Sequence, residues 1–358
     1  MTNSILLLLT IILFSACTPN AEGPADRVKP RIISEQVKHD TDDPAIWVNP
    51  QNPAKSLIVG TDKDADGALY VFDLQGKIDE EKTVRGLKRP NNVDIEYGLM
   101  INGESVDIAV VTERLENRIR IFRLPDMTAL DHGDLTVFDG ESLRAPMGIS
   151  LYKRPADGAI YAIVGRKDGP TDGTYLWQYR LEDDGRGQVK MNKVRAFGRY
   201  SGQKEIEAIA VDDALGYVYY SDEGVGIRKY AADPDALEAN EELALFGQND
   251  FEDDCEGISI YPLDDKTGYI LVSDQQANKF NVYKREGAPG APHIHQLIKS
   301  IAVSTTESDG SEVTSRILSP EFPGGLFVAM ADDRRFQYYA WDDLAGKDLQ
   351  SVTVAGLK

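Results

Sequence analysis

The chain has few of the residues that several common functions need. It contains two cysteines and four histidines in 358 residues, and it carries 39 basic against 59 acidic side chains. The net charge of -20 argues against a general nucleic-acid binder, which is basic. Four scattered histidines make zinc a poor candidate. There is no Arg-His-Gly triplet, no Gly-x4-Gly-Lys-Ser/Thr loop and no arginine six residues after Cys255. These absences exclude a phosphohistidine enzyme, a nucleotide-binding P-loop and a cysteine phosphatase.

Long apolar runs are also scarce. Residues 5–14 form an apolar run that is too short to span a membrane as a mature helix. The segment Phe14-Ser15-Ala16-Cys17 at its end resembles the lipobox of bacterial lipoproteins, in which the cysteine is cleaved free and acylated. We therefore expect a lipoprotein signal peptide over 1–16, a lipidated Cys17 and polar tether over 17–30, and one domain over 31–358. The protein would be exported and held at the cell envelope by its lipid, or secreted without it; cytoplasmic residence is the other alternative.

The cysteine count limits how the domain is stabilised. If Cys17 carries lipid, no disulfide within the chain is possible, so packing and metal must provide the stability. Cys255 is flanked by Asp254 and Glu256, whose charges raise the pKa of its thiol, so we expect a buried structural cysteine. His293 and His295 stand in a Pro/Gly-rich segment, which favours a structural role over metal binding.

A short pattern that ends in an aromatic residue recurs six times. Val, Ile, Tyr and Phe alternate with other residues over a few positions, between turns rich in Gly, Asp, Asn and Pro. The aromatic residues that end the copies lie 50 to 58 residues apart: Phe72, Phe122, Tyr179, Tyr230, Tyr283 and Trp341. Six copies at this period predict an all-β fold, a six-bladed β-propeller of mostly four-stranded antiparallel blades.

Each repeat supplies an inner strand, a second strand, the aromatic strand and an outer strand. We expect inner strands at 44–48, 93–97, 148–152, 208–212 and 257–261, and outer strands at 82–85, 135–138, 194–197 and 243–246. Blade six is weak, because residues 311–320 make a poor strand, and either 31–37 or 349–355 closes the ring. Inner strands of a propeller run along a common axis, so residues at one end of each meet around one mouth.

Acidic residues stand where these inner strands begin. They occur in Asp40-Thr41-Asp42-Asp43, Asn91-Asn92-Val93-Asp94, Glu205-Ile206-Glu207 and Asp254-Cys255-Glu256, with Asp222-Glu223 and Asp274 at second-strand ends and Asp309 in blade six. Ionised carboxylates that lie together repel one another unless a cation sits among them, and a set of oxygen ligands suits Ca²⁺. The alternative is that Asp, Asn and Gly only build the turns.

Basic residues end the second strands of three successive blades. Lys63 follows Gly60-Thr61-Asp62, Arg114 follows Val111-Thr112-Glu113, and Arg166-Lys167 follow Val164-Gly165. Cations at equivalent positions in an acidic protein indicate an anion site, and Arg can hold a phosphate through two parallel hydrogen bonds. Carboxylates that hold Ca²⁺ beside such cations could support attack of a metal-bridging water on a phosphate ester.

Several of these motifs resemble the β-propeller phytases. They are DTDDPAIW at 40–47, GTDKDADGALYVFDLQGK at 60–77, NNVDIEYG at 91–98, VDIAVVTER at 106–114, KVRAF at 193–197 and DCEGISIY at 254–261, so the likeness runs from about residue 31 to about residue 342. The resemblance implies a calcium-dependent alkaline phosphatase that hydrolyses myo-inositol hexakisphosphate (phytate), bound as its calcium complex, and releases inorganic phosphate. Such enzymes use a cleavage site and an adjacent phosphate-affinity site without a covalent intermediate. A monomer is the default.

The resemblance also implies roles for individual residues. The ligands of a catalytic calcium cluster would be Asp42, Glu207, Glu223, Asp254, Glu256 and Asp309. Asp43 with the Asn92-Val93 backbone would form a structural calcium site, and the phosphate binders would be Lys63, Arg114 and Lys167. Two positions depart from the family: Met147 stands where a tyrosine is common, and the loop Glu307-Ser308-Asp309-Gly310 is shorter, which predicts a missing or weaker structural calcium.

Two other functions remain open on the sequence alone. Six-bladed propellers also host calcium-dependent lactonases and esterases, and a propeller can be a non-catalytic surface binding module. The basic residues Lys63, Arg114 and Lys167 discriminate between the enzymes, because a lactone needs no set of three cations.

Overall fold

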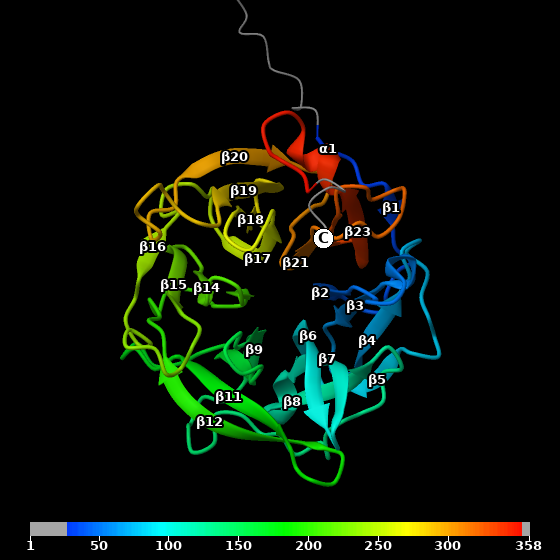
Figure 1. The fold of residues 1–358 in the computed structure, drawn as a ribbon, viewed down its shortest axis with the longest axis vertical. Coiled ribbons are helices and arrows are strands. Elements are labelled where there is room, and N and C mark those ends of the chain that lie inside the picture. Colours follow the sequence, from blue (N-terminus) through cyan, green and yellow to red (C-terminus); the bar gives the residue numbers. More distant parts are fainter. Residues whose placement is uncertain (1–26, 353–358) are drawn as a thin grey trace, which may run out of the picture.

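The computed structural model describes residues 27–352, and these form a ring of six antiparallel sheets around a central axis (Figure 1). Five sheets have four strands and one has three, so the predicted six-bladed propeller is confirmed. Residues 1–26, with the predicted signal peptide and Cys17, lie outside the described residues. No helix in the described part of the chain is long and apolar enough to cross a membrane.

The blades follow one another along the chain, and each runs from its innermost strand outward. Blade one is β2 (Thr41–Trp47), β3 (Leu57–Asp62), β4 (Gly67–Phe72) and β5 (Val84–Leu87); blade two is β6 (Pro90–Ile101), β7 (Glu104–Glu113) and β8 (Arg118–Leu124). Blade three is β9 (Pro146–Lys153), β10 (Ile160–Arg166), β11 (Leu176–Asp183) and β12 (Val189–Phe197); blade four is β13 (Ile209–Asp212), β14 (Tyr217–Asp222), β15 (Gly226–Ala231) and β16 (Ala244–Phe246). Blade five is β17 (Cys255–Pro262), β18 (Gly268–Asp274), β19 (Lys279–Lys284) and β20 (Leu297–Ala302), and blade six contains β21 (Ser311–Thr314), β22 (Leu326–Ala331) and β23 (Arg335–Ala340). Short helical turns are η1 (Pro53–Lys55), η2 (Arg114–Glu116) and α1 (Trp341–Ala345).

The ring is closed by the N-terminal end of the described chain. Strand β1 (Ile32–Ile33) pairs with β23 as the outer strand of blade six, in the register Ile32 with Tyr338. Of the two closing segments considered from the sequence, the structure therefore selects residues 31–37. The inner strand of blade six is the short β21, which lies within the segment that reads as a poor strand.

One predicted outer strand is wrong. Residues 135–138 make only an isolated bridge, between Thr136 and Arg118, so blade two has three strands. Phe138 has a positive φ of 54°, which extended backbone cannot contain. The segment instead turns inward, and Leu135, Val137 and Phe138 are buried in the core.

The second strands are covered on both faces by neighbouring blades and have very low solvent exposure. Every residue of β3, β10, β18 and β22 is buried, and Ile108, Val110 and Val111 of β7 are 0% exposed. A strand covered on both faces is apolar over most of its length, as in Leu57–Val59 of β3 and Ile270–Val272 of β18. This rigid middle layer holds the inner strands in place.

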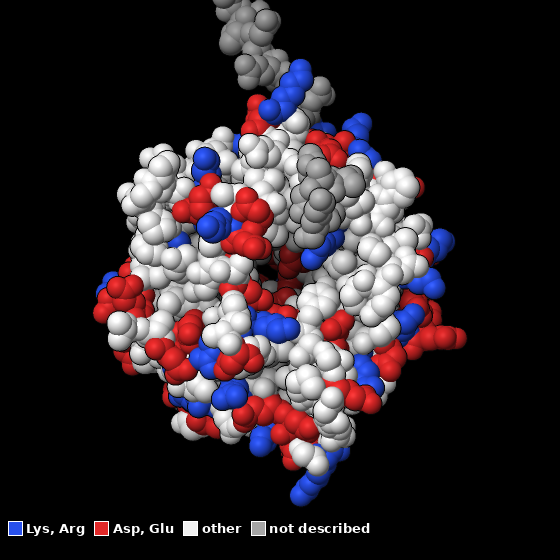
Figure 2. Space-filling model, in the orientation of Figure 1, with Lys and Arg blue, Asp and Glu red and all other residues white. Residues whose placement is uncertain are grey.

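The six inner strands line a narrow channel on the ring axis. A hollow of about 120 Å³ is bordered by residues from all six of them, among them Pro44, Val93, Ile149, Ala210, Ser259 and Glu312. Figure 2 shows the face of the ring on which the inner strands end, with a central hollow and acidic side chains in its wall. Because all six inner strands border one channel, the residues at the opposite end of each strand meet around a common mouth.

Candidate functional site

Three buried glutamates from blades four and five form the centre of the site. Glu207 precedes β13, Glu223 follows β14, and Glu256 lies in β17. One carboxylate oxygen from each lies within 4.8 Å of the others. All three residues are at most 9% exposed, so this is a concentration of negative charge away from solvent.

Burial and mutual repulsion raise the pKa values of this cluster. Desolvation and then the neighbouring Asp42 raise the pKa of Glu207 to about 7, and desolvation and then Glu207 raise the pKa of Glu223 to about 8. The pKa of Glu256 is raised well above its ordinary value, first by desolvation and next by Glu223. Such carboxyls are fully ionised at neutral pH only when positive charge lies among them.

The donor set fits a hard divalent cation. Oε1 of Glu223 and Oε2 of Glu256 are buried and have no hydrogen-bond partner within residues 27–352. Orphaned buried carboxylate oxygens are costly unless they bind a cation, and oxygen-only clusters are what Ca²⁺ accepts. The predicted ligands Glu207, Glu223 and Glu256 are thus brought together as the sequence indicated.

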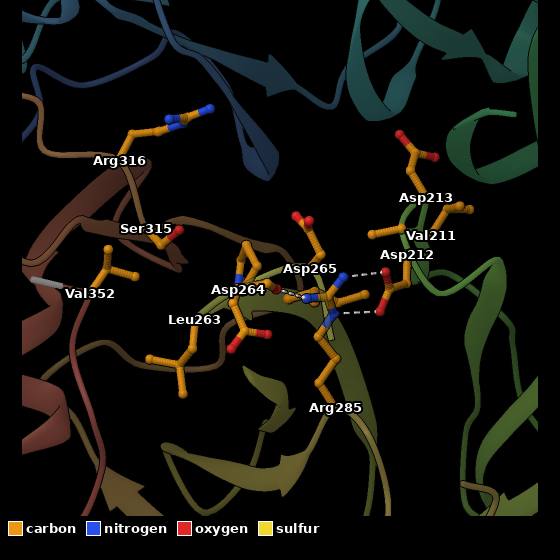
Figure 3. Close-up of a pocket in the computed structure, with 13 residues that line it drawn as sticks. Val211, Asp212, Asp213, Leu263, Asp264, Asp265, Arg285, Ser315, Arg316 and Val352 are labelled. Atoms are coloured by element: carbon orange, nitrogen blue, oxygen red, sulfur yellow. Dashed lines mark hydrogen bonds and ion pairs between the residues drawn. The ribbon is translucent and has the colours of Figure 1, made fainter. Parts of the chain in front are cut away.

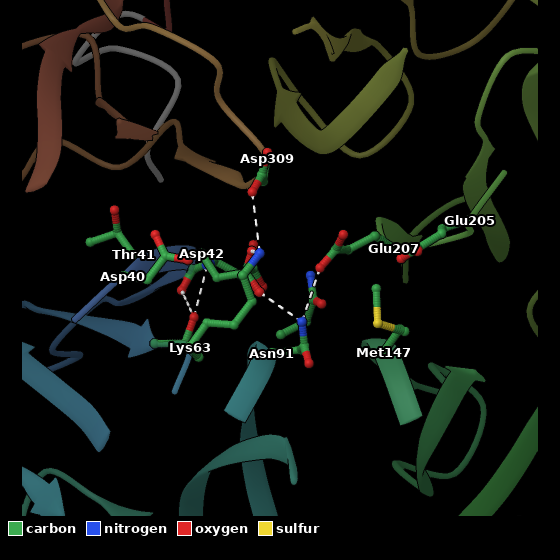
Figure 4. A network of polar contacts seen from close by, with 12 residues as sticks. Asp40, Thr41, Asp42, Lys63, Asn91, Met147, Glu205, Glu207 and Asp309 are labelled. Atoms are coloured by element: carbon green, nitrogen blue, oxygen red, sulfur yellow. Dashed lines mark hydrogen bonds and ion pairs between the residues drawn. The ribbon is translucent and has the colours of Figure 1, made fainter. Parts of the chain in front are cut away.

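Asp42 joins this cluster through two polar neighbours. Nζ of Lys63 lies 2.7 Å from Oδ1 of Asp42 and 3.4 Å from Oδ2 of Asp309. Nδ2 of Asn91 donates to Oδ2 of Asp42 at 3.0 Å and to Oε1 of Glu207 at 3.1 Å. Figure 4 shows Lys63 between the carboxylates of blades one and six, and Asn91 between Asp42 and Glu207. Desolvation still raises the pKa of Asp42 to about 6, because the residue is only 1% exposed.

Asp254 and Asp309 lie at the rim of the same mouth. Both are partly exposed, and each is held by a side chain of the mouth: Asp254 by Lys204, and Asp309 by Gln275 as well as Lys63. All six residues predicted for the calcium cluster therefore belong to one contiguous constellation. Asp309 comes from the short blade-six loop, which still reaches the mouth.

Asp43 faces a different place from its neighbour Asp42. Its Oδ2 accepts a hydrogen bond from the backbone N–H of Val93 at 3.0 Å. Oδ1 of Asn92 is buried without a partner among the described residues. The structure thus brings together Asp43, Asn92 and Val93, for which the family resemblance implied a structural calcium site.

β-Bulges separate these neighbouring side chains. The ladder between inner and second strands shifts register at the mouth end of four blades: between Thr41 and Pro44, Pro90 and Val93, Pro146 and Ile149, and Cys255 and Ile258. A bulge removes residues from the ladder and bends the strand, which re-aims their side chains. Asp42, Asn91 and Glu256 all stand in such bulges.

Glycines let adjacent blades approach at the mouth. A Cβ on Gly148 would lie 2.0 Å from the carbonyl oxygen of Glu207, and one on Gly310 would lie 2.6 Å from that of Asp42. Side-chain hydroxyls also link adjacent blades at the mouth. Thr112 donates a hydrogen bond to the Met147 carbonyl, and Ser221 donates one to the Glu256 carbonyl, both at 2.8 Å. These contacts between blades set the spacing of the acidic residues.

The predicted phosphate binders Arg114 and Lys167 lie together on the other side of the mouth. Nζ of Lys167 is hydrogen-bonded to Oε1 of Glu205, and Nη2 of Arg114 is 4.0 Å from Oε2 of the same carboxylate. Arg114 is 8% exposed, and its Nε and Nη2 have no hydrogen-bond partner within the described chain. A buried guanidinium with free donors is suited to binding an anion.

Three acidic residues singled out from the sequence do not enter the mouth. Asp94 accepts hydrogen bonds from Ser150 and Leu151 of the next blade, because β6 begins at Pro90 and Asp94 lies farther along the strand. Asp222 and Asp274 are structural: the first binds Arg228 at 2.8 Å and the second binds Lys279 at 3.1 Å. Arg166 is likewise structural, buried against Phe138 with hydrogen bonds to backbone carbonyls.

Cys255 and His295 are buried in the fold, as expected of structural residues, and His293 lies edge-to-face against Tyr217. Cys255 is 1% exposed, and burial raises the pKa of its thiol. His295 is buried beside Phe246, and desolvation lowers its pKa to about 4. Met147, at the position where the resembled family has tyrosine, is 1% exposed and lies beside the site in Figure 4.

A larger hollow, about 570 Å³, lies where inner strands end rather than begin. Its wall contains the bidentate ion pair of Arg285 with Asp212, whose contacts are both 2.6 Å, and Arg316 extends from the other side (Figure 3). Asp212 is the last residue of β13 and Pro262 the last of β17, whereas the acidic cluster gathers at the first residues of these strands. The pair is an ionic contact between blades four and five, and this hollow is not part of the candidate site.

The family model and the curated relative that match this chain indicate one family. The family model described as Phytase matches residues 2–340. The 3-phytase of Bacillus subtilis (strain 168) is 30% identical over 323 residues, which cover 85% of this chain and 80% of that protein. Among solved structures, a luciferin-regenerating enzyme matches with a TM-score of 0.52 and 13% identity, over 90% of this chain and 99% of the other. At that identity the structural likeness shows the propeller fold alone.

Proposed function

The chain belongs to the phytase family and is a phosphomonoester hydrolase, and on this premise we propose that it hydrolyses phytate in a calcium-dependent reaction. The observation that carries the proposal is the pairing of two unlike groups in one mouth. A buried carboxylate cluster with orphaned oxygens lies beside an arginine whose donors are free. A phosphate ester needs both, since its charge must be neutralised and its oxygens must be held.

The carboxylates would hold the calcium ions. The residues in this role are Asp42, Glu207, Glu223, Asp254, Glu256 and Asp309 around the mouth, with Asp43, Asn92 and Val93 at a separate structural site. Bound calcium would neutralise phosphate oxygens and lower the pKa of a water that attacks phosphorus in line. The orphaned oxygens of Glu223 and Glu256 support this assignment.

The basic side chains would bind and orient the phosphates. Lys63 lies among the carboxylates, so it is placed to contact the group that is cleaved. Arg114 and Lys167 share the carboxylate of Glu205, so they are placed to hold a neighbouring phosphate of the same ring. Together they would stabilise charge on the phosphate oxygens and fix the ring for attack.

The overall charge of the protein supports a role for bound cations. A polyanionic substrate is repelled by a net charge of -20, and calcium ions in the mouth would reverse the local field. Phytate would then be recognised as its calcium complex. A lactonase has no use for three cations at this mouth, which disfavours that alternative.

Phosphate release from phytate at mildly alkaline pH, measured with calcium and then with excess chelator, tests the proposal. We expect turnover with calcium and its loss on chelation, restored when calcium is returned. A matched pair of variants locates the site: Lys63→Met should abolish most turnover, whereas Lys266→Met, an exposed lysine at the other end of the inner strands, should not. Turnover that survives chelation, or hydrolysis of lactones in place of phytate, contradicts the proposal.

We also propose an exported monomer that is anchored to the cell envelope through lipid on Cys17, or secreted if that cysteine is not acylated. The lipobox-like segment supports this placement. Fractionation of cells that express the wild type and Cys17→Ala tests it: the variant should leave the membrane fraction. Equal membrane retention of the two proteins would contradict the anchor, and sedimentation of the soluble domain tests the monomer.

A further inference from the structure

Glu205 stands where an anion would bind to two of the proposed phosphate ligands. Its two carboxylate oxygens face different cations, Oε1 toward Nζ of Lys167 and Oε2 toward Nη2 of Arg114. A phosphate that bound these two side chains would present two oxygens in the same way. The carboxylate and the phosphate are therefore alternatives at one position.

The backbone of Glu205 is fixed but its side chain is not enclosed. The residue lies between β12 and β13, and its carbonyl accepts a hydrogen bond from the N–H of Glu223 at 3.2 Å. The side chain is 32% exposed, so the carboxylate can rotate into solvent without any change in the backbone. By contrast Glu207, two residues on, is 9% exposed and belongs to the buried cluster.

We propose that Glu205 is an internal competitor of phosphate, an affinity-determining residue that an incoming phosphate must displace from Lys167 and Arg114. This inference rests on the proposed function. Without the competitor, an arginine with free buried donors and a lysine would hold both substrate and released phosphate more tightly. Glu205 thus weakens the binding of both and keeps the mouth from being blocked by product.

The size of the effect follows from the exposure of the ion pair. A partly exposed carboxylate–ammonium contact changes an equilibrium constant by up to about fivefold. We therefore expect Glu205→Gln to lower the dissociation constant of a simple dianion by about three- to fivefold and to lower the KM for phytate by a similar factor. Glu205→Asp has a shorter side chain of the same charge. Its dissociation constant and its KM should lie between those of the wild type and those of Glu205→Gln.

Inorganic sulfate is the probe, because it mimics phosphate and is less prone to precipitate with calcium. Its dissociation constant is measured by calorimetry on the full domain in calcium, and its inhibition constant against phytate is measured in parallel. The matched control is Asp253→Asn, which removes the same charge from the mouth but from an exposed carboxylate that contacts Lys204 rather than Lys167 or Arg114. We expect the control to change the sulfate dissociation constant less than twofold.

Two results would overturn the inference. If Glu205→Gln binds sulfate no more tightly than the control variant does, Glu205 does not compete with the anion. If Glu205→Gln binds sulfate more weakly, Glu205 supports the anion site. Both readings require a melting curve like that of the wild type, and Glu205→Asp provides a second variant if the first does not fold. Tighter sulfate binding by a protein that fails to hydrolyse phytate would uphold the competitor and refute the proposed function instead.

Discussion

Lys63 and Asp42 form a largely buried ion pair with a distance of 2.7 Å between Nζ and Oδ1. The side chains are 14% and 1% exposed. The same ammonium lies 3.4 Å from Asp309, so one basic residue links carboxylates from the first and sixth blades across the closure of the ring. Burial raises the pKa of Asp42, whereas the carboxylates around Lys63 raise the pKa of the ammonium. The ammonium of Lys63 thus balances part of the negative charge that is buried at the mouth.

Asp42→Asn should remove activity and keep the fold. We expect phosphate release from phytate to fall by about a hundredfold or more, because a central carboxylate of the cluster is lost. The measurement is the turnover number together with a melting curve. Asp157→Asn, which makes the same charge change at an exposed hairpin, should stay within twofold. A variant with more than a tenth of the wild-type turnover would contradict a role for Asp42 in the reaction.

Asn91→Ala tests a positioning residue that belongs to a motif noted in the sequence but to which the sequence assigned no role. Its amide donates to both Asp42 and Glu207, so its loss should let two carboxylates separate. We expect the turnover number to fall about tenfold with little change in KM, and calcium affinity measured by calorimetry to fall as well. The exposed Asn192→Ala is the control. Unchanged calcium affinity would show that Asn91 does not hold the cluster.

Gly148→Ala should disturb the joint between blades three and four. The added Cβ would lie 2.0 Å from the carbonyl of Glu207, so backbone must shift, at a cost of about 1–3 kcal/mol in the free energy of unfolding. Gly165→Ala is the matched control, since its nearest neighbours would be 3.5 Å away. Denaturant unfolding and turnover should both be affected in the first variant, and stability should change little in the second. Equal stability of the two variants would rule out the close approach.

Lys229 gives the protein a pH-dependent stability far from the mouth. The residue is 0% exposed, and its Nζ donates to the carbonyl of Pro292 and faces His295 and the ring of Tyr217. Desolvation lowers the pKa of Lys229 to about 8 from the ordinary 10.5. At a pH between these two pKa values, Lys229 is protonated in the unfolded chain and neutral in the folded protein. The free energy of unfolding should therefore rise with pH across this window, by up to about 3 kcal/mol.

Urea unfolding at several pH values between 7 and 10.5 measures this contribution. Lys229→Met should lack the rise that the wild type shows, whereas the exposed Lys190→Met should retain it. A difference between wild type and Lys229→Met that does not vary with pH would mean that the buried amine keeps its ordinary pKa in the fold.

The sequence predicted the ring and most of the mouth, because a repeat of fixed period places equivalent residues at equivalent positions. That argument places the motifs that contain Asp42, Glu207 and Glu256 at the mouth, and the resemblance to the β-propeller phytases selects these three residues within the motifs. The argument failed for Asp94, since it assumed that β6 starts near Val93. The strand starts at Pro90, so the mouth position in blade two belongs to Asn91. A neutral amide gave no signal in a search for carboxylates.

Other features depend on neighbours that the sequence does not reveal. The separate directions of Asp42 and Asp43 depend on a bulge, and the roles of Gly148 and Gly310 depend on how closely blades approach. Glu205 and Glu207 belong to one acidic motif, yet one faces Lys167 and the other the buried cluster. Contacts of this kind are decided by three-dimensional packing and not by spacing along the chain.

The pairing of β1 with β23 has a consequence for how the protein is made. Strand β23 is synthesised after most of the chain. Its outer edge therefore has no partner until β1, from the N-terminal part of the chain, pairs with it. Until then the unfinished ring presents unpaired backbone groups along an open strand, a template for association with other chains. We therefore expect a product that lacks β1 to expose the outer edge of β23 and to aggregate more readily than the complete ring.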